Sequence, residues 1–159
     1  MVARPSESKG ANMGHFLATT LLLASLAPAT TPAESLWNGT WLLDVGRSTP
    51  GIKDQAAEGY RFTLQPDGQI KWEIPSLGEV VTGKTDGVPM EIHRTKPSPG
   101  LTLSVTAEGP EVLIYKVARN GKPEGEGRMT LVENGKAWVD ISWPAGQPQY
   151  AGEVIYVKQ

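Results

Sequence analysis

Acidic side chains at alternate positions of strand-like segments are the residues in this sequence that could do acid and base chemistry. Glycoside hydrolysis, for example, needs only two carboxyl groups at a set separation. Five carboxylates fall where an alternating strand could turn them inward, and they are Glu73, Glu91, Glu126, Asp140 and Glu153. Carboxylates spaced in this way more often form the solvated face of a half-buried sheet. We therefore assign no catalytic residue.

His93 is the other side chain that could take part in catalysis. The second histidine, His15, lies in an N-terminal segment that we expect to be removed, so a site with two histidine ligands is excluded. A Ser-His-Asp triad could be built only through His93. Because His93 follows a segment that is interrupted by Pro89, we expect it to be exposed in a loop or at the end of a strand.

The composition excludes several further kinds of site. The chain has no cysteine, which excludes disulfides, thiolate metal ligands and a cysteine nucleophile. The sequence also has no glycine-rich phosphate loop and no acidic calcium-binding loop. We expect neither a metal nor a cofactor.

Aromatic side chains are the best candidates for ligand contacts, because aromatic rings supply much of the wall of many small-molecule pockets. The residues that we assign to such a wall are Trp72, Tyr115, Trp138 and Trp143. Trp138 is out of phase with Trp143 along one alternating segment, so these two rings should face opposite sides of a sheet. The alternative for all four is ordinary packing in the core or on the sheet surface.

These residues must be positioned by β-strands, because apolar and polar residues alternate with a period of two from Gly39 onward. Asn120-Gly121 and Asn134-Gly135 are the strongest hairpin signals, since both central residues of a type I′ turn have positive φ. The strands that the pattern predicts are 39–45, 60–64, 70–74, 79–84, 88–94, 101–106, 111–118, 124–132, 137–143 and 149–157.

The segments 79–84 and 88–94 are the weakest of this set, so we count eight or nine strands. Almost every connection joins neighbours in the sequence, which is typical of an antiparallel up-and-down meander. A sandwich would need longer crossovers. Closure of the meander into a barrel would remove the exposed edges of such a large sheet. The sequence therefore predicts an all-β fold, an antiparallel barrel preceded by a leader.

The leader that we predict is a secretory signal peptide over residues 1–33. A polar start with two basic side chains is followed by the apolar run 16–29 and then by small residues, which is the order of such a peptide. Cleavage is expected after Ala29 or Ala33. The alternatives are a membrane anchor and a buried core helix, but the run is shorter than the roughly 20 residues that cross a bilayer, and we expect no membrane span in the mature chain.

The remaining residues, 34–159, are long enough for one domain with a single core. A start of translation at Met13 instead of Met1 would leave this domain unchanged. Removal of the leader takes away two basic residues and one acidic residue, so the formal charge moves from −2 to about −3. This balance gives no reason to expect nucleic acid as a partner, and the expected location is the periplasm or the extracellular space.

The two ends of the predicted domain carry the most specific motifs. The first strand reads Gly39-Thr40-Trp41-Leu42-Leu43-Asp44 and is followed by Ser48, and the last strand reads Glu153-Val154-Ile155-Tyr156-Val157-Lys158-Gln159. Two turns between them read Asn120-Gly121-Lys122 and Asn134-Gly135-Lys136. In these features the chain resembles the small exported bacterial lipocalin-like proteins, a calycin-type family.

The resemblance implies a closed barrel and a habit of binding small ligands. It implies that Gly39 and Trp41 form the barrel-closing motif, with the tryptophan filling one end. It also implies a basic residue late in the barrel that packs over this tryptophan, and Lys158 and Arg128 are the two candidates. This chain departs from a typical lipocalin in its smaller size and in its lack of disulfides.

Three functions remain open at this point. The first is an exported barrel without catalytic activity that binds a small, mostly apolar or amphipathic molecule. The second is a structural or protein-interaction module of the cell envelope with a filled interior. The third is a small carbohydrate-active or isomerase-like enzyme that uses a carboxylate together with His93.

Overall fold

The computed structural model describes residues 33–50 and 59–159, within a compact unit that spans Pro32–Gln159. The predicted signal peptide lies outside these residues except for Ala33, as do residues 51–58. The described chain is all-β, with ten strands: β1 Gly39–Leu43, β2 Tyr60–Leu64, β3 Gln69–Ile74, β4 Glu79–Lys84, β5 Met90–Glu91, β6 Leu101–Ala107, β7 Val112–Arg119, β8 Lys122–Val132, β9 Ala137–Pro144 and β10 Gly152–Lys158.

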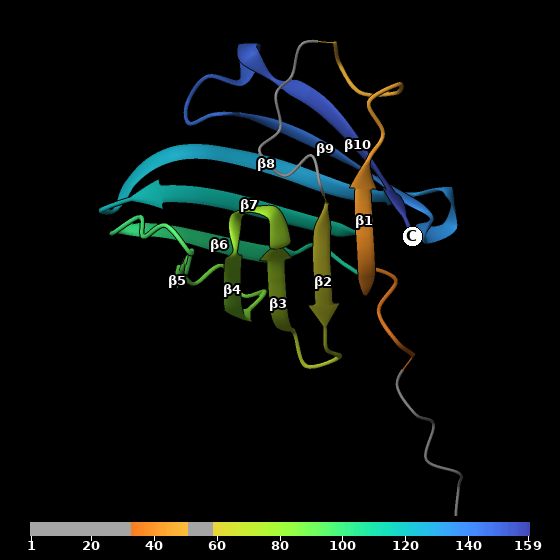
Figure 1. Cartoon of the computed structure of the whole chain (residues 1–159), viewed down its shortest axis with the longest axis horizontal. Coiled ribbons are helices and arrows are strands. Elements are labelled where there is room, and N and C mark those ends of the chain that lie inside the picture. The colour runs from red at the N-terminus through yellow and green to blue at the C-terminus, as the bar shows by residue number, and fades with distance from the viewer. Residues whose placement is uncertain (1–32, 51–58) are drawn as a thin grey trace, which may run out of the picture. The chain divides into compact units, whose positions relative to one another are not determined.

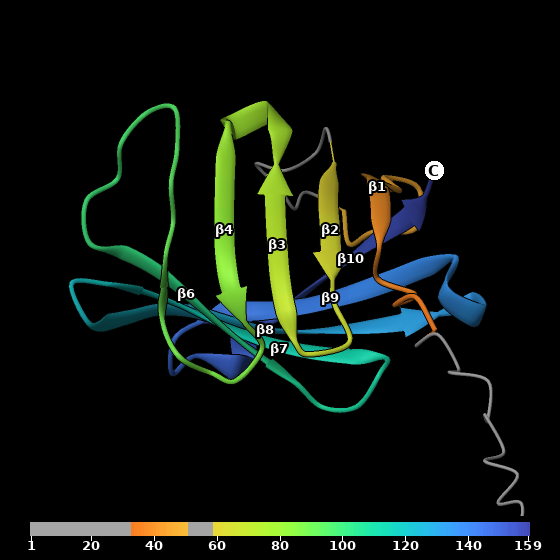
Figure 2. The same cartoon turned by 90° about the horizontal axis from the view of Figure 1, so that it is seen from below.

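The strands form one antiparallel sheet in the order β4-β3-β2-β1-β10-β9-β8-β7-β6-β5. Because β1 pairs with β10, the first and last strands are neighbours and every other neighbour in the sheet is a neighbour in sequence. The short strands β1 to β4 stand across the longer, curved strands β6 to β9 (Figures 1 and 2). The predicted antiparallel meander is thus confirmed, and it forms a nearly closed barrel.

The barrel closes less completely between β4 and β5, which we call the seam. Val80 and His93 exchange two backbone hydrogen bonds, of 2.8 and 3.0 Å, and Asp86 forms a second isolated bridge with Thr106. The predicted count of eight or nine strands was too low, because this region contributes a separate strand. That strand, β5, is only two residues long and lies just after Pro89, which has no N–H to donate to a ladder.

Three short 3₁₀ segments that the sequence pattern does not predict lie between strands, and they are η1 Pro75–Leu77, η2 Glu133–Gly135 and η3 Pro148–Tyr150. Asn120 and Gly121 form the predicted two-residue turn, with φ of 49° and 76°. At the second Asn-Gly pair the hairpin forms, but four residues separate Val132 from Ala137, and Glu133 also has positive φ. Because η3 occupies the segment before β10, the last strand begins three residues later than predicted.

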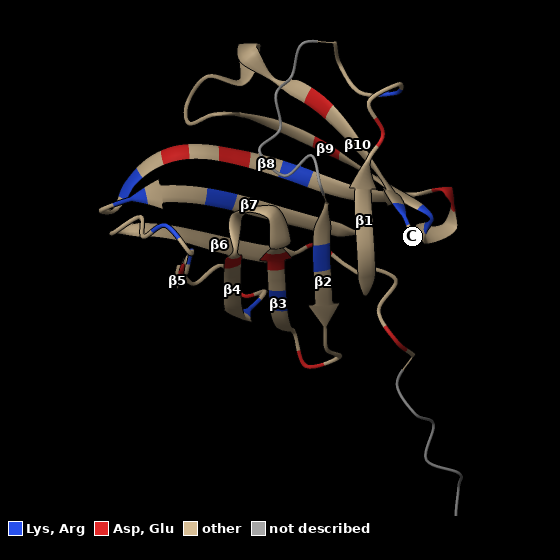
Figure 3. Cartoon of the chain, viewed as in Figure 1, with Lys and Arg blue, Asp and Glu red and all other residues tan. Residues whose placement is uncertain are grey.

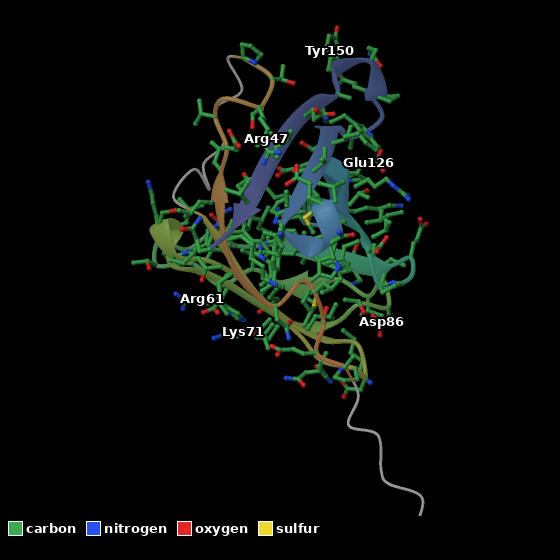
Figure 4. All side chains as sticks on the ribbon, turned by 90° about the vertical axis from the view of Figure 1, so that its right-hand side faces the viewer. Arg47, Arg61, Lys71, Asp86, Glu126 and Tyr150 are labelled. Carbon is green, nitrogen blue, oxygen red and sulfur yellow. The ribbon has the colours of Figure 1, made fainter. Side chains whose placement is uncertain are left out.

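Alternation places apolar side chains inside the barrel and charged ones outside. On β3, Ile70, Trp72 and Ile74 are buried, whereas Lys71 points outward. Figure 4 shows Arg61 and Lys71 directed away from the interior. Charges of both signs are interspersed along the strands, most visibly on β8 (Figure 3). The described residues contain no helix that is long and apolar enough to span a membrane.

One end of the barrel, which we call the closed end, is filled by Trp41 and by residues around it. Trp37 and Trp41 are fully buried. The Trp41 indole N–H donates to the Trp37 carbonyl at 2.9 Å, and the Trp37 indole N–H donates to the Pro110 carbonyl at 3.1 Å. These bonds tie the segment before β1 to the loop between β6 and β7.

Lys158 covers Trp41 from the last strand. Its ammonium nitrogen lies 5.0 Å from the centroid of the Trp41 ring and donates to the Leu36 carbonyl at 2.9 Å. Gly39 leaves room for this side chain, because a Cβ at position 39 would lie 3.0 Å from Lys158 Cε. Of the two basic residues considered above, Lys158 is the one that packs over Trp41, whereas Arg128 pairs with Glu108.

An exposed ion pair cluster joins the loop after β1 to η2. Arg47 lies 2.8 Å from the Asp44 carboxylate and 2.6 Å from that of Glu133. The pKa of Asp44 lies below its ordinary value, mainly because the Arg47 side chain donates a hydrogen bond to the carboxylate. Since the folded-state pKa is lowered, Asp44 contributes stability that is present above its unfolded pKa and is lost as the pH falls.

Trp41→Phe should destabilise the protein by about 2–3 kcal/mol, because it leaves a gap in the core and removes the donor to the buried Trp37 carbonyl. Trp143→Phe, at a partly exposed position, should lower the free energy of unfolding by less than about 1 kcal/mol. Urea denaturation of both variants checks this expectation. Equal losses in the two variants would contradict the structural role that we assign to Trp41.

Asp44→Asn should remove an acid-sensitive part of the stability. The difference in unfolding free energy between the native protein and this variant should be largest above about pH 5 and should shrink as the pH falls below about 4, the unfolded pKa of an aspartate. Thermal unfolding at several pH values measures this difference. A difference that grows on acidification would contradict the lowered pKa of Asp44.

Candidate functional site

The barrel interior holds a cavity of about 220 Å³, which we call the lumen pocket. It lies beyond the closed end, and its lining comes from both halves of the sheet and from the segment after β5. Its aliphatic lining consists of Ile74, Ile92, Leu101, Leu103, Val117 and Met129. At this volume the pocket suits a compact molecule, since typical pockets for drug-sized ligands measure about 300–1,000 Å³.

Three aromatic rings form one side of the lumen pocket. Tyr60 and Trp72 lie with their ring centroids 5.7 Å apart at an interplanar angle of 84°, and Trp72 and Tyr115 lie 5.7 Å apart at 74°. These nearly perpendicular contacts are the favoured edge-to-face arrangement of aromatic rings. The three rings therefore form an aromatic corner, the name that we use for Tyr60, Trp72 and Tyr115 below.

Tyr115 is oriented by a hydrogen bond and by a glycine. Its hydroxyl donates to the carboxylate of Asp140, with O–O distances of 3.0 and 3.2 Å. Gly127 on β8 lies opposite Tyr115 in the sheet, and a Cβ there would come within 2.5 Å of Tyr115 Cζ. The ring can lie flat over β8 only because residue 127 has no side chain.

Glu79 and Arg94 supply the other polar groups of the lumen pocket. Arg94 Nε donates to Glu79 Oε2 at 2.5 Å, and only 5% of the Glu79 side chain is exposed. Glu79 opens β4 and Arg94 follows the bridge between Val80 and His93, so this ion pair spans the seam. The same contact closes the barrel and lines the cavity. Removal of Arg94 would leave a buried carboxylate without its partner charge.

A second cavity, the mouth pocket, adjoins the lumen pocket. It measures about 450 Å³ and shares Tyr115 and Val117 with the lumen pocket. Glu124, Glu126 and Trp143 also line it, and the Trp143 indole N–H donates to Glu126 at 3.0 Å. The two pockets share these two residues, so they lie next to each other.

The four residues predicted as a ligand wall occupy three different places. Trp72 and Tyr115 line the lumen pocket, and Trp143 lines the mouth pocket. Trp138 lines neither of these pockets. It is buried at the closed end, stacked on Tyr156 with ring centroids 4.2 Å apart. As the alternation predicts, Trp138 and Trp143 fall on opposite faces of β9.

Trp138 still influences the lumen pocket indirectly. Its ring contacts that of Tyr60 at 5.6 Å, and Tyr60 lines the cavity. The indole nitrogen of Trp138 and the hydroxyl of Tyr156 are both buried without a hydrogen-bond partner among the described residues. Both residues therefore act through packing, as a support behind the aromatic corner.

The five carboxylates considered for catalysis do not gather in one place. Asp140 lines the lumen pocket and is 9% exposed. The other four lie on the outer surface, in a surface groove or in the mouth pocket. Glu73 pairs with Lys71 at 3.0 Å, and Glu91 and Glu153 are exposed. Glu126 accepts the Trp143 hydrogen bond described above.

His93 is exposed and lies outside the lumen pocket. Its side chain lines a surface groove of about 450 Å³ that it shares with Glu91, Arg94 and the loop before β6. The clear structural contribution of His93 comes from its backbone, which bridges to Val80 across the seam. Within residues 33–50 and 59–159, no three acidic or histidine side chains cluster as metal ligands.

Glu79, Arg94 and Tyr60 line the site but were not selected from the sequence. Val80 and Val81 stand side by side, so the alternation of β4 does not show which of its residues face inward. Arg94 lies in an irregular segment between a two-residue strand and a proline-rich loop. Tyr60, by contrast, is in phase with Phe62 and Leu64, and this alternation could have identified it.

Comparisons with known proteins do not assign the chain to a family. No family model matches the chain, and a search of curated proteins finds no match to it.

Gly127→Ala should displace the Tyr115 ring and break its hydrogen bond to Asp140, lowering the free energy of unfolding by about 1–3 kcal/mol through overpacking. Gly125→Ala is the matched control on the same strand and the same face. A Cβ at position 125 would meet only the Trp143 carbonyl at 3.6 Å, an ordinary contact. Urea denaturation compares the two variants, and equal stabilities would contradict the close approach of Tyr115 to Gly127.

Proposed function

We propose that this chain is an exported, lipocalin-like barrel that binds a compact, mostly apolar molecule in the lumen pocket. The observation that carries this proposal is a cavity of about 220 Å³ inside the barrel, walled by three aromatic rings and six aliphatic side chains. Apolar cavities with a few convergent polar groups are the usual form of small-molecule sites. Here the convergent polar groups are Glu79, Arg94 and Asp140.

The lipocalin-like assignment is supported by the closed end. A glycine and a tryptophan on the first strand, with a basic side chain from the last strand packed over the tryptophan, match what the resemblance implies for Gly39, Trp41 and Lys158. Export is supported by the order of polar, apolar and small residues over positions 1–33. The protein would then act in the periplasm or the extracellular space.

The size of the cavity favours compact ligands over long ones. A volume of about 220 Å³ is close to that of seven water molecules in the liquid, at roughly 30 Å³ each. An indole-sized ring fits this space better than a fatty acid or a retinoid, whose length would extend into the mouth pocket. We therefore expect indole to bind more tightly than palmitate or glucose.

The second candidate is an envelope module with a filled interior, and the packing of the closed end favours it. Four large aromatic side chains are almost completely buried there, and they are Trp37, Trp41, Trp138 and Tyr156. The two proposals differ only in whether the lumen pocket is used.

Titration of the protein with indole, palmitate and glucose, followed by calorimetry and by amide chemical shifts, tests the proposal. Indole should bind with a Kd below about 1 mM and should shift the amides of β3, β7 and β9. Val117→Trp, which places a large side chain between the two pockets, should weaken this binding at least tenfold. Ile114→Trp on the outward face of the same strand is the matched control and should leave it unchanged.

Loss of binding in both tryptophan variants would place the ligand outside the barrel. Absence of binding by all three compounds would overturn the small-molecule proposal in favour of the filled module.

A further inference from the structure

We propose that the lumen pocket is selective for an organic ammonium group carried on a compact apolar body. This inference rests on the small-molecule function proposed above and names the chemical class of the ligand. It depends on the polar groups and the aromatic rings that converge on the cavity, and on the charge of the mouth pocket beside it.

The charged groups that line the lumen pocket have an excess of negative charge. They are two carboxylates, Glu79 and Asp140, and one guanidinium, Arg94. Arg94 is engaged by Glu79 through the 2.5 Å contact across the seam. An anionic ligand would therefore have to approach two carboxylates and compete with Glu79 for the guanidinium, which costs it a large part of its hydration energy.

Asp140 is suited to receive an ammonium group. Its carboxylate lines the cavity beside Tyr115, whose hydroxyl donates a hydrogen bond to it. An ammonium group has three donors in a compact head. Because Asp140 is 9% exposed, a charge-assisted bond to it would form where solvent screens it weakly.

The aromatic corner provides a second interaction for the same group. Tyr60, Trp72 and Tyr115 all line the cavity, and Trp72 meets each of the other two rings at a nearly right angle. A cation within about 6 Å of an aromatic face is attracted by the ring quadrupole, most strongly when it is desolvated. Carboxylate and aromatic faces together favour a cation over a neutral group of the same size.

The mouth pocket adds one more negative group. Glu126 lines it, whereas the other acidic residue of its lining, Glu124, is paired with Arg119 at 2.7 Å. A carboxylate beside the lumen pocket raises the local concentration of cations. The aliphatic side chains of the lumen pocket would then contact the apolar body of the ligand.

Three probes of similar shape and different charge test this proposal by calorimetry on the full chain: 2-phenylethylamine, 2-phenylethanol and 3-phenylpropanoate. We expect the protonated amine to bind at least tenfold more tightly than the alcohol, and the carboxylate to bind most weakly. This order is measured on the native protein and so does not depend on the folding of any variant.

Asp140→Asn should weaken the binding of the amine about tenfold and leave that of the alcohol unchanged. Glu153→Gln is the matched control, because it removes the same charge from the exposed outer face of β10. It should leave the affinity for the amine unchanged. Equal losses of amine affinity in these two variants would overturn the role of Asp140.

The remaining outcomes separate this inference from the function on which it rests. Equal affinities for the amine and the alcohol would overturn the selectivity for ammonium and leave small-molecule binding in place. Tightest binding by 3-phenylpropanoate would also overturn it and would point to Arg94 as the recognition group. Absence of binding by all three probes would overturn both proposals.

Discussion

Contacts among eight aromatic rings of the described barrel connect its closed end to its pocket. At the closed end the rings of Trp37, Trp41, Trp138 and Tyr156 fill the interior. Tyr60 contacts both Trp138 and Tyr156 and also lines the lumen pocket, so one ring belongs to the core and to the site. The position of the pocket wall thus depends on core packing, which is dense and deforms little.

Much of the fold follows from short-range pattern in the sequence. Alternation and turn residues predict the meander, because one face of each strand in a barrel packs against the core and the other faces water. The count of strands and the shape of the second Asn-Gly hairpin do not follow in the same way. The short strand β5 is held by its pairing with β6, and the turn after Val132 accommodates four residues instead of two. Glu133 in this turn pairs with Arg47, which lies 86 positions away in the sequence.

The candidate site was predictable only in part, for a similar reason. Alternation shows that Trp138 and Trp143 face opposite sides of β9, but it does not show which side is inside. Asp140 has the spacing of a solvated carboxylate, and its contact with Tyr115 depends on the register of β7, β8 and β9. Glu79 and Arg94 meet across the seam, where neither local propensity nor periodicity defines the register.

The pairing of β1 with β10 has a consequence for how the chain folds. Lys158 contacts the segment before β1 across 122 positions of sequence, and such distant contacts raise the contact order and slow folding. During synthesis Trp37 and Trp41 therefore lack their final cover until the last strand has been made. The barrel interior, with its pocket, can reach its native packing only after the whole domain has left the ribosome.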